Sequence, residues 1–134
     1  MSQGDTRRKP EVELRLPADS AYASVLRTTT AGLAARLDFT LDDIEDLRIA
    51  IGEASALVLP QADPGADLTC RFYLDHYAMT VEVSVPSAAP APQDPDSFAW
   101  QVLSTLTTDS QLDASGGALT VRLTMASSLG EADL

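Results

Sequence analysis

The chain has 134 residues, and its 9 Lys and Arg against 20 Asp and Glu give a net charge of −11 at pH 7. Its 45% hydrophobic content is enough for a folded domain with a buried core. A surface this acidic repels nucleic-acid backbones and anionic membranes, and no apolar run is long enough to span a bilayer. The single cysteine, Cys70, excludes an internal disulfide, so we expect a cytoplasmic protein without nucleic-acid or membrane partners.

The first half of the chain predicts a strand followed by two helices. Residues 1–10 are polar and basic and are expected to form a flexible tail, and the alternation over 11–16 predicts a strand that ends at Pro17. From Asp19 the apolar period becomes helical, with a stripe of Tyr22, Val25, Leu26, Thr29, Leu33 and Leu37. A second helix begins near Thr40, whose capping box is completed by Asp43. Its core stripe is Ile44, Leu47, Ile51, Ala54 and Val58.

The second half predicts two hairpins and a short helix. Residues 68–74 and 77–85 alternate in polarity and turn at Asp75 and His76. Four of the 8 prolines fall in 86–97, so this segment is expected to be irregular, and a short helix follows from Phe98. A last hairpin turns at 115–117. We therefore expect a single α+β domain over 11–127, a two-layer sandwich with a mostly antiparallel sheet and helices on one face, and a frayed tail over 128–134.

Four stretches of the chain resemble the GHKL (Bergerat) ATPase fold in its smallest form. They read VELRLPADSAYASVLRTTTAGLAARL, LDDIEDLRIAIGEASALVL, the hairpin at 67–85 and SGGALTVRL. More narrowly, the pattern is similar to anti-sigma factors that are also serine-protein kinases, the RsbW/SpoIIAB type. The stretch SFAWQVLSTL resembles actinobacterial members of that family.

The resemblance implies three ATP-binding motifs, and the sequence departs from each of them. In the family's Glu-x-x-x-Asn motif, Glu53 matches the general base, but Leu57 stands at the Mg²⁺-binding asparagine and a leucine cannot ligate Mg²⁺. The two glycine motifs correspond to 86–97 and the start of the short helix, yet no glycine occurs between Gly65 and Gly116. We therefore expect a degenerate ATP site with no resident metal. ATP and Mg²⁺ as cofactors, and enzyme activity itself, stay open, and with its motif partner missing Glu53 is better interpreted as an ordinary helix glutamate.

The resemblance implies an anti-sigma factor that sequesters an alternative sigma factor of the stress or sporulation type. Its control would be partner switching with a STAS-type antagonist, it would form a homodimer, and helix 20–37 is the candidate contact surface. One alternative is an active or weakly active serine-protein kinase that phosphorylates the antagonist. Another is a scaffold in a different partner-switching pathway.

Three further features have two interpretations each. Trp100 is either an interface anchor or a packed core residue. The acidic run 42–46 either contacts a sigma factor or is a solvated helix start that matches the helix dipole. Segment 86–97 is either a partner-docking loop or a linker. His76 is interpreted as a turn residue and Cys70 as a buried, unreactive thiol.

Overall fold

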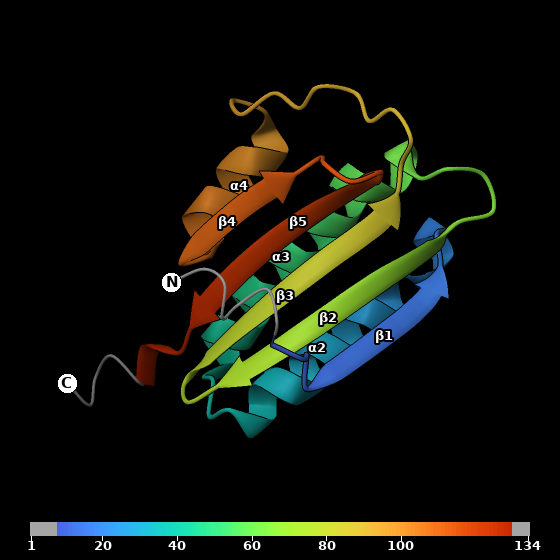
Figure 1. Cartoon of the computed structure of the whole chain (residues 1–134). Helices are drawn as coiled ribbons and strands as arrows, with labels where there is room; N and C mark the ends of the chain where they lie inside the picture. Colours follow the sequence, from blue (N-terminus) through green and yellow to red (C-terminus); the bar gives the residue numbers. More distant parts are fainter. Residues whose placement is uncertain (1–7, 130–134) are drawn as a thin grey trace.

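The computed structural model describes residues 8–129, and it confirms the predicted two-layer α+β fold (Figure 1). Residues 1–7 and 130–134, parts of the two predicted tails, lie outside the described residues. The strands are β1 (Val12–Pro17), β2 (Asp67–Asp75), β3 (Ala78–Pro86), β4 (Asp109–Asp113) and β5 (Ala118–Ala126). The helices are η1 (Ser20–Tyr22), α2 (Ala23–Arg36), α3 (Leu41–Val58), η2 (Leu59–Gln61) and α4 (Phe98–Leu106), of which η1 and η2 are 3₁₀ turns.

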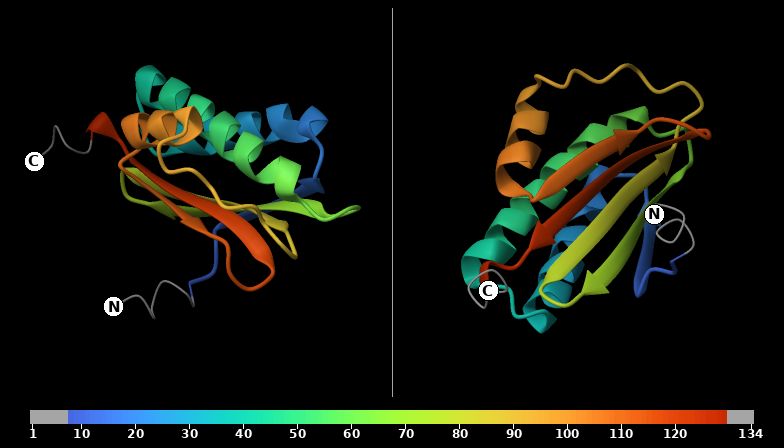
Figure 2. Two further views of the ribbon diagram at one scale, coloured as in Figure 1. Left: turned by 90° about the horizontal axis from the view of Figure 1, so that it is seen from above. Right: turned by 60° about the vertical axis from the view of Figure 1, so that its left-hand side comes forward.

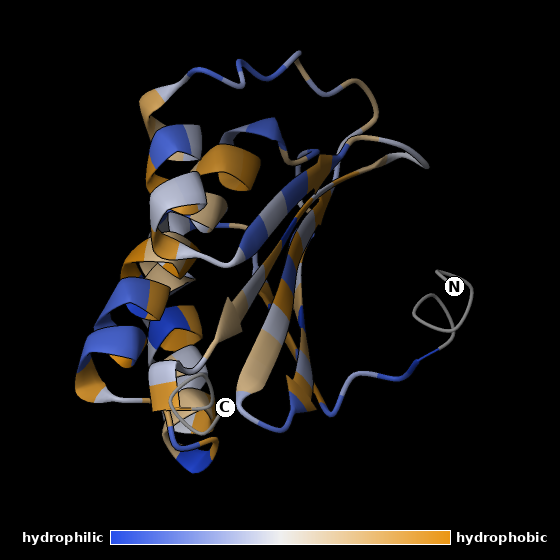
Figure 3. Ribbon diagram, turned by 90° about the vertical axis from the view of Figure 1, so that its left-hand side faces the viewer, coloured by the Kyte–Doolittle hydropathy of each residue, from blue (hydrophilic) through white to orange (hydrophobic). Residues whose placement is uncertain are grey.

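The five strands form one antiparallel sheet in the order β1-β2-β3-β5-β4. The three α-helices cover one face, and the other face is open (Figure 2). Hydropathy alternates along the strands (Figure 3), and buried residues alternate with less buried ones in β2, β3 and β5, as expected for a sheet covered by helices on one face. The fully buried residues Phe72, Val81 and Leu123 share one register row across β2, β3 and β5.

Helix α3 begins and packs as the sequence predicts. The Thr40 hydroxyl accepts a hydrogen bond from the Asp43 N–H at 3.1 Å, and the Asp43 carboxylate accepts one from the Thr40 N–H at 3.3 Å. This reciprocal pair is the predicted capping box. Leu47, Ile51, Ala54 and Val58 of the predicted stripe are fully buried, and Ile44 packs partly buried against them.

The first helix confirms part of its predicted stripe, since Leu26 is fully buried and Leu33 and Leu37 pack partly buried against the core. Tyr22 and Val25 were assigned to the core stripe, but they are 40% and 43% exposed. Tyr22 belongs to the 3₁₀ turn η1 that precedes the α-helix, whereas Val25 lies within α2, one residue before Leu26. The buried residues of α2 are Leu26, Thr30 and Ala34. The Thr30 hydroxyl donates a hydrogen bond to the Leu26 carbonyl at 2.8 Å.

The β2–β3 turn is displaced by one residue from its predicted place. It is made by His76 and Tyr77, and Tyr77 has a φ of 60°, a left-handed conformation that is uncommon outside glycine and asparagine. The closing β4–β5 turn contains Gly116 and Gly117 at φ of 70° and 75°, where glycine is favoured. None of the helices in residues 8–129 combines the length and apolar character needed to cross a membrane.

Candidate functional site

Glu53 lies on α3 and lines a shallow hollow of about 300 Å³ between α2 and α3. The hollow is formed by Arg27, Glu45, Arg48, Ile49, Gly52 and Glu53. None of these residues belongs to segment 86–97 or to α4, which correspond to the glycine motifs of the family. The structure therefore places Glu53 beside α2, apart from the segments that carry those motifs.

Leu57 lies one helical turn after Glu53 and packs, partly buried, against the hydrophobic core. Its hydrocarbon side chain supplies no oxygen to a cation, and Mg²⁺ binds through oxygen ligands. Within residues 8–129, no group of three or more His, Cys, Asp or Glu side chains could hold a metal ion. Leu57 therefore leaves the position of the family's Mg²⁺-binding asparagine without an oxygen ligand.

Segment 87–97 is attached to the turn that follows α3. The Ala88 N–H donates to the Asp63 carboxylate at 3.0 Å, and the Ala91 N–H donates to the Gln61 side-chain carbonyl at 2.9 Å. The Asp63 N–H in turn donates to the Pro86 carbonyl at 2.9 Å. In a glycine-rich loop, backbone N–H groups of this kind donate hydrogen bonds to a phosphate. Here the N–H groups of Ala88 and Ala91 donate to side chains of the same chain instead.

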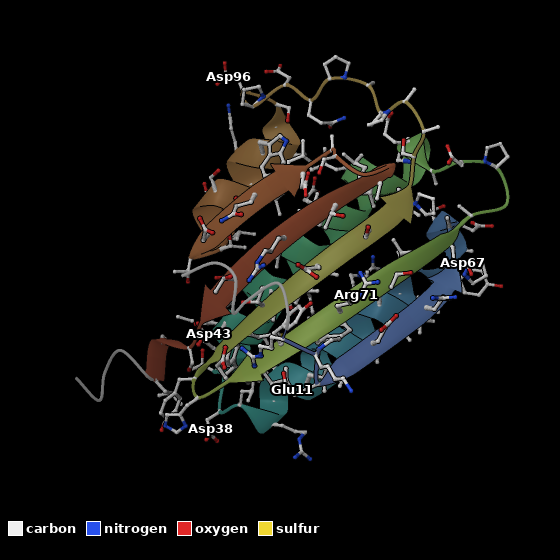
Figure 4. All side chains as sticks on the ribbon, in the orientation of Figure 1. Glu11, Asp38, Asp43, Asp67, Arg71 and Asp96 are labelled. Atoms are coloured by element: carbon white, nitrogen blue, oxygen red, sulfur yellow. The ribbon has the colours of Figure 1, made fainter. Side chains whose placement is uncertain are left out.

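The N-terminus of α4 is capped by its own residues. The Ser97 hydroxyl accepts from the Trp100 N–H at 3.3 Å, and the Asp94 carboxylate accepts from the Asp96 N–H at 2.9 Å. A helix N-terminus ordinarily attracts anions, but here two carboxylates precede it, one of them on Asp96 in Figure 4. This arrangement disfavours a phosphate group.

Helix α4 packs directly against α3, and its Leu103 is fully buried. Together with Leu57, the engaged backbone of 87–91 and the acidic start of α4, this packing shows that the residues present do not fit Mg-ATP. The role of Glu53 as a general base stays a prediction.

Asp43, in the acidic run 42–46, has a structural role. Its carboxylate accepts hydrogen bonds from the Ser128 N–H at 3.0 Å and the Ser128 hydroxyl at 2.9 Å, besides the one from Thr40. Burial raises the pKa of Asp43, but these hydrogen bonds outweigh it and hold the pKa below its ordinary value. Asp43 thus connects the start of α3 to the chain after β5 (Figure 4), while Asp42 and Glu45 beside it are exposed.

The open face of the sheet carries a row of polar side chains, four of which are charged. The sequence analysis did not predict this row. One residue from each strand shares the row, namely Glu13, Arg71, Glu82, Arg122 and Gln111. Arg122 is 3.5 Å from Glu82, and Arg71 is 4.0 Å from Glu13. Each strand shows polar residues at alternate positions, but their alignment into one row depends on the strand register, which a single sequence does not give.

Tyr73 lies on the same open face of β2, two residues after Arg71. Its hydroxyl donates to Glu82 at 3.0 Å, and the guanidinium carbons of Arg8 and Arg122 lie 5.6 Å and 6.0 Å from the centre of its ring. Burial and the neighbouring Glu82 raise the pKa of Tyr73. Arg8, a residue of the predicted tail, also pairs with Asp75 at 3.1 Å.

The other residues that the sequence analysis singled out lie in different parts of the fold. Trp100 packs partly buried against the core and lines a hollow between α4 and β4. Cys70 is fully buried, and burial raises its pKa to about 12. His76 is exposed in the β2–β3 turn, with its ring centre 4.1 Å from that of Tyr77. The structure does not bring Glu53, Trp100 and His76 into one site.

Several large apolar side chains on the helices are exposed, with Leu41 at the start of α3 and Phe98 at the start of α4 the most exposed, at 85% and 75%. Tyr22 of η1, Val25 of α2 and Ile49 of α3 are each 40% or more exposed. An exposed apolar surface of this kind is typical of a protein contact. The fold defines the class as a GHKL-like α+β domain whose helical layer carries exposed apolar side chains.

No family model matches the chain. The serine-protein kinase RsbW of Halalkalibacterium halodurans is 40% identical over 78 residues, which are 57% of this chain and 48% of that protein. The RsbW of Bacillus thuringiensis is 42% identical over 52 residues, which are 39% of this chain and 32% of that protein. The chain thus matches half or less of the length of these relatives.

A crystal structure of the RsbU and RsbW domains of a Mycobacterium tuberculosis protein superposes with a TM-score of 0.64. It covers 90% of this chain and 34% of that one, at 16% sequence identity, and therefore supports the fold alone. The sequence matches and the shared fold confirm the resemblance to RsbW-type proteins of the GHKL fold.

Proposed function

We propose that this chain is an anti-sigma module of the RsbW partner-switching type that works by protein binding. The single observation that carries the proposal is the combination of an RsbW-like sequence and fold with residues that do not fit Mg-ATP. Its partners are an alternative sigma factor and a STAS-type antagonist that competes for the same module. The net charge of −11 complements the basic nucleic-acid-binding surfaces of sigma factors.

The proposed contact surface is the region 20–37, as the resemblance implies. Tyr22 and Val25 are exposed there although both are apolar, and a buried aromatic anchor is typical of a binding hot spot. A homodimer through the same region belongs to the proposal. It would be seen as a doubled mass in sedimentation equilibrium.

A calorimetric titration of the chain with the alternative sigma factors of the same cell tests this function. We expect one of them to bind, and Tyr22→Asp and Val25→Asp to weaken that binding at least about tenfold, as for hot-spot residues. Phe98→Asp is the matched control, because Phe98 is 75% exposed on a different helix and its replacement should leave the affinity unchanged. Failure of every sigma factor to bind would reject the proposal.

The competing function, phosphorylation of the antagonist, is tested on the same material. Incubation of chain and antagonist with Mg-ATP is expected to leave the antagonist unphosphorylated. Phosphate transfer that is lost in Glu53→Gln would favour the kinase alternative and give Glu53 its predicted role as general base.

A further inference from the structure

Strand β4 forms one edge of the sheet and has a paired neighbour, β5, on one side only within residues 8–129. Every second residue of an edge strand directs its N–H and C=O groups away from the sheet, where they are free to pair with another strand. Helix α4 packs beside this strand on the helical face (Figures 1 and 2). The free edge of β4 and the neighbouring side of α4 therefore border the same space.

Two adjoining hollows of about 280 and 210 Å³ occupy this space, and Ser110 of β4 lines both of them. The first is mainly apolar and is lined by Gln93, Pro95, Trp100, Ser110, Gln111 and Leu112. The second is polar and is lined by Ser104, Thr107, Thr108, Asp109 and Ser110. Together they form a groove between α4 and β4, which we name the β4 groove.

Among the residues that line the two hollows of the β4 groove, the one charged side chain is the acid Asp109. Asp113 lines a separate hollow on the open face together with Arg71 and Arg122. Asp109 and Asp113 lie at the two ends of β4, and Asp94 and Asp96 flank Pro95 on the other side of the groove. No lysine or arginine lines either hollow. Asp109 and Asp113 share the open face of the sheet with Gln111, because side chains of one parity point to one face of a strand.

We propose that the β4 groove binds an extended, basic peptide segment of a partner protein, which adds as a sixth strand beside β4. The edge of β4 supplies main-chain hydrogen bonds, as in other cases of strand addition. The alternation of an added strand would place apolar side chains against Trp100 and Leu112, and Lys or Arg side chains beside Asp109 and Asp113. This surface is separate from region 20–37 and does not depend on the proposed function.

The test uses the full chain and a synthetic peptide, Lys-Val-Lys-Val-Lys-Val-Lys, in calorimetry and in tryptophan fluorescence. Trp100 is the single tryptophan and lies in the groove, so binding should change its emission. Two peptides of the same length serve as controls. One carries glutamate in place of lysine, and the other keeps the lysines but is N-methylated at alternate backbone nitrogens. We expect binding of the first peptide only, because the second has the wrong charge and the third cannot complete a strand ladder.

Two pairs of variants locate the binding site, each with one change in the β4 groove and one control outside it. Trp100→Ala should weaken it at least about tenfold, as for an anchor residue, whereas Phe98→Ala on the same helix should not. Asp109→Lys should weaken it by a similar factor, while Asp42→Lys, an exposed acid on α3, makes the same charge change away from the groove and should have little effect. The second pair keeps the test valid if Trp100→Ala destabilises the chain.

Three outcomes would overturn the proposal. Equal binding of the N-methylated peptide would mean that only charge attracts the ligand. Equal weakening by Asp42→Lys would mean that the site lies elsewhere on the acidic surface. No binding of the lysine peptide at millimolar concentration would mean that Asp109 and Asp113 only keep the edge from pairing with other chains.

Discussion

Replacement of Asp43 by alanine is expected to separate the structural role of this carboxylate from a role in partner contact. The change removes the acceptor of three hydrogen bonds, from the Thr40 N–H and from the N–H and hydroxyl of Ser128. Asp42→Ala is the matched control. Asp42 lies in the same first turn of α3 and carries the same charge, so loss of the helix-dipole interaction and gain of helix propensity are common to both variants.

The expected difference between the two variants follows from these hydrogen bonds. A helix cap contributes about 0.5–2 kcal/mol, and hydrogen bonds near the surface contribute modestly, so Asp43→Ala should lose about 1–2 kcal/mol more free energy of unfolding than Asp42→Ala at neutral pH. The pKa of Asp43 is lowered in the folded state. Its contribution is therefore complete above the unfolded pKa of about 4 and is lost as the pH falls through the folded pKa.

Urea denaturation followed by circular dichroism, at neutral pH and at successively lower pH, measures this difference. The urea dependence of the free energy should be the same in both variants, because neither changes the surface exposed on unfolding. Equal stability of the two variants at neutral pH would refute the reasoning. A difference that grows on acidification would refute it as well, because the sign would be opposite.

Three further outcomes follow from the structure. Leu103→Ala should lower the free energy of unfolding by about 2–5 kcal/mol in urea denaturation, because a fully buried leucine holds α4 against α3. Cys70 should resist a thiol reagent in the native chain and react at once in denaturant, since burial raises its pKa to about 12. In a spectrophotometric titration, Glu82→Gln should lower the pKa of Tyr73, because it removes the negative charge and the carboxylate hydrogen bond that help to raise this pKa.

Much of the fold could be predicted because local patterns and tertiary packing agree. The helical spacing of Leu47, Ile51 and Ala54 places them on one face of α3, and that face packs on the sheet. The prediction for the first helix was wrong near its start, where Tyr22 in the 3₁₀ turn and Val25 beside the buried Leu26 are both exposed. Strand alternation is robust by comparison, because its period of two leaves only two faces to choose between.

For the candidate site, the sequence predicts only which residues of an ATP site are missing. Leu57 and the lack of glycine in 86–97 indicate a degenerate ATP site, and the structure adds that Asp63 and Gln61 engage the backbone of that segment. The β4 groove depends on the position of α4 relative to a sheet edge. The spacing of residues along the chain does not contain that information, because it arises from the strand order and the crossover through segment 86–97.

The most direct test of the central account is the affinity of the chain for its sigma factor, measured by calorimetry with and without Mg-ATP. The account predicts the same affinity in both conditions, because binding uses the helical face and the residues at the nucleotide position do not fit Mg-ATP. An affinity that depends on Mg-ATP, and is lost when Glu53 is replaced by glutamine, would contradict it.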